Sequence, residues 1–124
     1  MINISHITFH TLPVTDQDRA LAFWRDVMGF EVSADAEYMP GQRWIMLRPW
    51  DARTNIHLDQ VDEMPERDKP AIPFVCPDVD EAVTHLKSKD VEIVQDPAPA
   101  PWDADTVFAM FNDSEGNLVL LSSK

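Results

Sequence analysis

A pattern of one helix followed directly by a strand occurs twice in this chain, and this repetition restricts the fold more than any other feature. The first copy spans Asp16–Val32. Its apolar residues recur at intervals of three and four, which places them on one face of a helix: Ala20, Phe23, Trp24, Val27 and Met28. Asp16 or Asp18 can accept the free amide hydrogens at the helix start, and Gly29 suits a left-handed helix end. Phe30 and Val32 then alternate with a polar residue, as in a half-buried strand.

The second copy spans Asp78–Ile93. Asp78 is a good helix N-cap, and Glu81 follows three residues later as in a capping box. Four residues of each copy align at one constant offset: Asp16, Ala20, Leu21 and Trp24 with Asp78, Ala82, Val83 and Leu86. Residues 29–32 align with 90–93 once one residue is lost between them. The chain is therefore predicted to be an internal duplication.

Strands are predicted around both helices. In the first half they cover residues 4–14, 30–32, 43–48 and 54–59, with a turn at 39–42. In the second half they cover residues 71–76, 91–94, 106–111 and 118–122, with a proline-stiffened extended link at 96–101 and a turn at 112–117. Each half thus reads as a βαβββ module.

These modules predict an α+β fold in one domain, residues 1–124. Module one covers about 1–60, a charged surface connection about 60–70, and module two about 71–124. One such module is too small to bury both faces of its sheet. Two tandem modules can form an open, barrel-like mixed sheet with the helices outside and a cavity inside, where a ligand would bind.

Composition limits the partners. The chain has 22 acidic and 10 basic residues, a formal net charge of −12, which disfavours binding to nucleic acid or anionic membranes. There is no apolar run long enough to span a bilayer, no signal-peptide pattern, and a single cysteine, Cys76. We therefore expect a cytoplasmic protein. Arg43 and Arg48 bracket an apolar strand, where an inward arginine could hold an anion.

Two stretches resemble a known family. Residues 14–32 resemble the first-module signature of the vicinal oxygen chelate superfamily, which includes glyoxalases, bleomycin resistance proteins and extradiol dioxygenases. Pro101–Trp102 and residues 111–121 look like its closing hairpin. The resemblance covers nearly the whole chain and implies the fold described above. It does not imply one reaction, because this superfamily contains lyases, isomerases, dioxygenases, thiol transferases and non-catalytic drug-binding proteins.

The resemblance also implies four positions where metal enzymes of the superfamily usually carry ligands. In this chain they are Phe9, His57, Ala71 and Leu120. Only His57 has a donor atom, and one imidazole holds a divalent ion poorly, so no metal or other cofactor is expected. The alternative is one divalent ion, Fe, Mn, Ni or Zn, held by His57 with His10 if a β-bulge turns His10 inward.

A small-molecule pocket is the other expectation. If Phe9 faces the cavity, strand alternation sends Thr11 there too, together with Asn55, His57 and Asp59. Trp44 and Trp102 add aromatic surface, and Trp102 could stack on a planar ligand or lie in a dimer contact. Phe9 could equally fill the cavity as core. His57 and Asp59 form a possible acid–base couple, which makes His57 the candidate catalytic residue.

Three functions remain open from the sequence. The first is a metal-independent member of the superfamily that binds a small organic molecule, either to sequester it or to transform it with His57. The second is a metal-dependent lyase, isomerase or dioxygenase. The third is a non-catalytic structural or interaction module. A homodimer is expected in each case.

Overall fold

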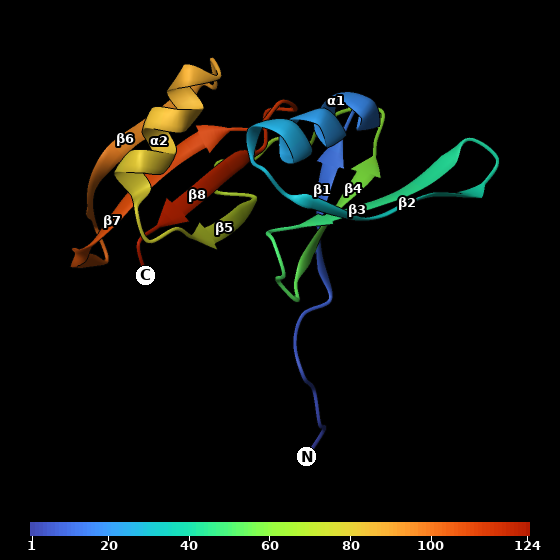
Figure 1. Cartoon of the computed structure of the whole chain (residues 1–124), viewed down its shortest axis with the longest axis horizontal. Helices are drawn as coiled ribbons and strands as arrows, with labels where there is room; N and C mark the ends of the chain where they lie inside the picture. The colour runs from blue at the N-terminus through green and yellow to red at the C-terminus, as the bar shows by residue number, and fades with distance from the viewer. The chain divides into compact units, whose positions relative to one another are not determined.

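Two βαβββ modules follow one another along the chain, as the duplication predicts (Figure 1). The computed structural model describes residues 1–124. It divides into Met1–Met64 and Pro65–Lys124, so the boundary lies within the predicted connection. Neither helix has the length and apolar character that a membrane crossing needs.

Module one contains β1 (Phe9–Val14), α1 (Gln17–Ala22), a π-helical turn η1 (Phe23–Val27), β2 (Glu31–Met39), β3 (Gln42–Arg48) and β4 (Asn55–Gln60). The strand order is β1-β4-β3-β2, with β1 parallel to β4 and the other pairs antiparallel. The parallel pair is possible because α1 provides part of the long crossover between them.

Module two contains β5 (Ile72–Val75), α2 (Val79–Ser88), β6 (Ile93–Ala100), β7 (Asp103–Asn112) and β8 (Leu118–Ser122). Its strand order is β5-β8-β7-β6, again with the first and last strands parallel. The two modules therefore share one topology, which confirms two tandem βαβββ modules in an α+β fold. Each sheet is open and mixed. The barrel-like arrangement of both sheets stays a prediction.

The predicted helix ends are confirmed by their geometry. Asp16 Oδ1 accepts a hydrogen bond from the Arg19 amide at 3.0 Å, and Asp78 Oδ1 accepts one from the Glu81 amide at 3.0 Å. Gly29 has φ +75°, in the left-handed region that favours glycine. One detail differs from the prediction, because the second half of the first helix is a π turn in which the Met28 amide donates to the Phe23 carbonyl.

Module one has its core between α1, η1 and one face of the sheet. The sheet contributes alternate, buried side chains: Leu12, Val14, Ile45, Leu47, Ile56 and Leu58. Trp24 is fully buried, with its ring centroid 5.5 Å from that of Phe23 and 5.3 Å from that of Phe30. This burial fixes which face of each strand points toward the helix, and therefore which residues remain on the other face.

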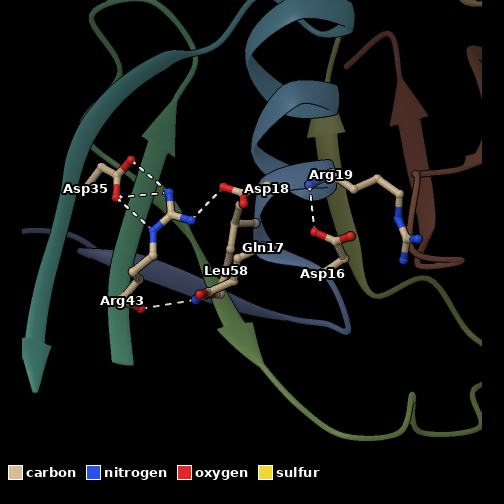
Figure 2. A network of polar contacts seen from close by, with 7 residues as sticks. All are labelled: Asp16, Gln17, Asp18, Arg19, Asp35, Arg43 and Leu58. Carbon is tan, nitrogen blue, oxygen red and sulfur yellow. Dashed lines mark hydrogen bonds and ion pairs between the residues drawn. The ribbon is translucent and has the colours of Figure 1, made fainter. Parts of the chain in front are cut away.

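A polar network ties the start of α1 to the sheet (Figure 2). The guanidinium of Arg43 lies 2.6 Å from Asp18 Oδ1 and 3.1 Å from Asp35 Oδ2, so it bridges the helix and β2. Gln17 Nε2 donates to the backbone carbonyls of Arg43 and Leu58, at 3.1 and 3.0 Å. Arg43 thus has two carboxylate partners within the protein and is not available as an anion site.

Three predicted strands have different limits in the structure. The first strand begins at Phe9 instead of residue 4, because its partner β4 begins at Asn55, directly opposite Phe9. The strand after the first helix extends to Met39 through its pairing with β3. Val32 on this strand is 40% exposed, although the alternating pattern predicts that it lies on the buried face. The proline link at 96–101 falls largely within β6, an edge strand where a missing amide hydrogen is tolerated.

The predicted turn at 112–117 joins β7 to β8 around a buried carboxylate. Asp113 is 6% exposed and accepts hydrogen bonds from the amides of Glu115 and Asn117, at 2.9 and 2.8 Å. The Asn117 side chain donates a third, at 3.0 Å. Burial raises the pKa of Asp113, and these hydrogen bonds oppose the rise. The turn is thus held by one side chain.

Candidate functional site

The sheet of module one carries a group of aromatic and polar side chains on the face opposite α1. We call this the aromatic face, and it consists of Phe9, Thr11, Trp44, Met46, Arg48, Asn55, His57 and Asp59. These residues alternate along β1, β3 and β4 with the buried core residues. The register agrees, because Phe9 lies opposite Asn55, Thr11 opposite His57, and Met46 opposite His57. The predicted residues of module one are therefore brought together.

Three rings meet on this face. The rings of Trp44 and His57 are stacked, with centroids 3.9 Å apart and planes 26° apart. Phe9 approaches both edge-on, at 5.5 Å from Trp44 and 5.4 Å from His57. Tyr38 of β2 adds a fourth ring, 6.2 Å from Trp44. Phe9 is 36% exposed, so it does not serve only as core.

His57 is the buried polar group of the cluster. Its exposed fraction is 8%, and its Nδ1 lies 3.3 Å from the hydroxyl oxygen of Thr11. Burial lowers the pKa of His57, and the negative charge of Asp59 opposes this only in part. The imidazole is therefore neutral at pH 7 and can accept a proton.

The other polar groups differ in availability. Both ends of the Asn55 amide are engaged, since Nδ2 donates to the Thr8 carbonyl at 3.1 Å and Oδ1 accepts from the Ser33 hydroxyl. Arg48 is held by Glu31 at 2.5 Å and donates to the Ala52 carbonyl at 3.1 Å. The carboxylate of Asp59, by contrast, is exposed and makes no hydrogen bond or ion pair.

The residues present do not fit the metal site that the resemblance implies. Phe9 packs its ring against Trp44 and His57, Ala71 is buried, and Leu120 pairs with Pro73. No group of three or more His, Cys, Asp or Glu side chains that could hold a metal ion occurs in residues 1–124. His57 alone does not hold a divalent ion firmly.

The alternative site of His10 with His57 is wrong. His10 pairs with Ile56, and the β1–β4 ladder runs without a bulge, so His10 and His57 lie on opposite faces of the sheet.

Tyr38 was missed by the sequence prediction, and Trp102 does not belong to the module-one cluster. Tyr38 lies in residues 33–39, which were not predicted as strand, and the β2–β3 register shifts between Glu37 and Met39. Trp102 belongs to module two, where it is 58% exposed and its ring centroid lies 5.5 Å from that of Phe108. Its role in ligand binding stays a prediction.

Known proteins resemble this chain over nearly its full length. The model of the glyoxalase/bleomycin resistance protein/dioxygenase superfamily matches residues 3–121. The uncharacterized protein YetH of Bacillus subtilis strain 168 is 31% identical over 110 residues, 87% of this chain and 89% of YetH.

Solved structures of the same fold also resemble this chain over nearly its full length. TnmS3, an antibiotic binding protein from Streptomyces sp. CB03234, is 30% identical with a TM-score of 0.83, covering 98% of this chain and 97% of TnmS3. A superfamily member from Sphaerobacter thermophilus DSM 20745 is 27% identical with a TM-score of 0.85, covering 96% of this chain and 97% of its own. With its duplicated βαβββ modules, this chain belongs to the glyoxalase/bleomycin resistance protein/dioxygenase superfamily.

Proposed function

We propose that this protein binds a small, planar, partly apolar organic molecule on the aromatic face, and that binding needs no resident metal ion. The observation that carries the proposal is the ring cluster of Phe9, Trp44 and His57, in which Phe9 and Trp44 remain partly exposed. Aromatic surface beside a few polar groups is typical of small-molecule sites. A planar ligand would gain ring contacts that water cannot provide.

The similarity to TnmS3 supports sequestration as the role of binding. TnmS3 is an antibiotic binding protein that shares the fold and 30% of its residues with this chain. The donor set supports the metal-independent form of the proposal, since the four implied ligand positions hold one imidazole between them. If the bound molecule is transformed, His57 is the proton acceptor we expect, because its imidazole is neutral and packs against the exposed rings.

The test is calorimetric titration of the full chain, purified in EDTA, with bleomycin and with tryptophol as a neutral planar probe. A probe of about twelve heavy atoms at roughly 0.4 kcal/mol each binds with a Kd on the order of 1 mM or below. We expect binding of at least one probe, and for tryptophol, which does not chelate metal ions, the same affinity after excess Zn²⁺ or Ni²⁺ is added.

Matched tryptophan variants locate the site. Trp44→Ala removes the stacked ring and is expected to weaken binding at least ten-fold, whereas Trp50→Ala removes a ring that is 81% exposed and should change nothing. The proposal fails if neither probe binds, if the affinity for tryptophol depends on added metal, or if both variants behave alike.

A further inference from the structure

The aromatic face has an uneven balance of charge. Its only cationic side chain is Arg48, which already pairs with Glu31 and donates to the Ala52 carbonyl. His57 is buried and uncharged at neutral pH. An anionic ligand would therefore have to break an existing ion pair before it found a positive partner.

Asp59 is the one charged group of the face without a partner. It follows His57 by two residues on β4, so its side chain lies on the same face, about 7 Å further along the strand. Its carboxylate is exposed and makes no hydrogen bond or ion pair. Its charge also reaches the ring cluster, because it raises the pKa of His57 against the effect of burial.

We infer that the ligand bound on the aromatic face is a planar aromatic cation, whose ring packs against Trp44 and Phe9 and whose protonated amine points toward Asp59. This inference rests on the proposed function and adds the class of ligand. Ring faces attract cations through their quadrupole, and the Asp59 carboxylate adds a full negative charge. The net charge of −12 further raises the local concentration of cations.

Three probes with the same ring test this class of ligand. Tryptamine, tryptophol and indolepropionate carry an amine, an alcohol and a carboxylate on the same indole, and only the first is a cation at pH 7. We expect tryptamine to bind about 3- to 10-fold more tightly than tryptophol at low ionic strength, and indolepropionate to bind most weakly. Titrations of ¹⁵N-labelled protein measure the affinities, and the indole N–H signal of Trp44, assigned with Trp44→Phe, reports on the site.

Two charge-matched variants separate a local contact from the overall charge. Asp59→Asn is expected to abolish the preference for tryptamine over tryptophol. Asp51→Asn removes the same charge from the turn between β3 and β4, at a left-handed position (φ +61°) that asparagine tolerates, and should keep the preference.

The outcomes distinguish this inference from the proposed function. If tryptophol binds near Trp44 and tryptamine binds no better, or if Asp51→Asn and Asp59→Asn reduce the preference equally, the cation inference is wrong while the binding site stands. If neither tryptophol nor tryptamine shifts the Trp44 signal, the binding site itself is refuted.

Discussion

Removal of the Trp44 ring gives the sharpest test of how the aromatic face is built. Trp44→Ala deletes a stacked contact with His57 and edge contacts with Phe9 and Tyr38. The three ring contacts contribute about 0.5 kcal/mol each at a partly exposed site, and about 100 Å² of buried indole surface contributes up to about 2.5 kcal/mol more. We expect Trp44→Ala to lower the free energy of unfolding by roughly 3–4 kcal/mol.

The same substitution should change the titration of His57. With the indole gone, water reaches the imidazole, so the desolvation that lowers the pKa of His57 is relieved and its pKa moves up toward the ordinary value. Urea unfolding measures the stability, and an NMR pH titration of the histidine ring protons measures the pKa, with His57→Gln to assign the signal.

Trp50→Ala provides the control, because Trp50 is 81% exposed and is expected to change stability by less than about 0.5 kcal/mol. Equal stability losses for both variants, or an unchanged pKa of His57 in Trp44→Ala, would refute the packing described for the aromatic face.

Three further predictions concern single residues. Because folding lowers the pKa of His57, the unfolded chain takes up a proton at His57 before the folded chain does as the pH falls below about 6.5, so stability is lost in that range. In urea unfolding, the wild type should therefore lose more stability between about pH 7 and pH 5 than His57→Gln. Equal losses would contradict this. Gly29→Ala should cost about 1 kcal/mol in thermal unfolding because φ is +75°, and Gly29→Asn less, whereas a reversed order would contradict the strain argument. Asp113→Ala removes the acceptor of three hydrogen bonds and should cost about 2–4 kcal/mol in urea unfolding, and a change below 0.5 kcal/mol would show that the turn is held by other groups.

The helices and the duplication could be predicted because their signals are local. The N-caps Asp16 and Asp78 precede their helices directly, and Gly29 and Asp90, which align in the two copies, both have positive φ. The π turn could not be predicted, since an apolar stripe at intervals of three and four does not distinguish an α turn from a single π turn.

The strand limits depend on partners that are distant in sequence. Residues 34–37 are Ala, Asp and Glu, which are depleted in strands, yet they form a strand because β3 pairs with them. The prolines of β6 are accommodated at a sheet edge. The apolar residues before Phe9, Ile4 and Ile7 among them, remain exposed because β4 begins only at Asn55.

The candidate site likewise has features that the local sequence predicts and features that depend on contacts between residues distant in sequence. Alternation along β1 and β4 was enough to place Phe9, Thr11 and His57 on one face. It could not predict that Asn55 contacts Ser33 or that Tyr38 reaches Trp44, because both contacts lie at the register shifts of β2. Asp59 could be placed on the face, but its lack of a partner is visible only in the folded structure.

The central claim, that the aromatic face binds a planar organic molecule, is tested most directly by intermolecular NOEs between tryptophol and ¹³C-labelled full-length protein. The account predicts NOEs from the indole protons of tryptophol to the rings of Phe9 and Trp44, which form the partly exposed part of the cluster. NOEs to other side chains, with none to Trp44, would contradict it.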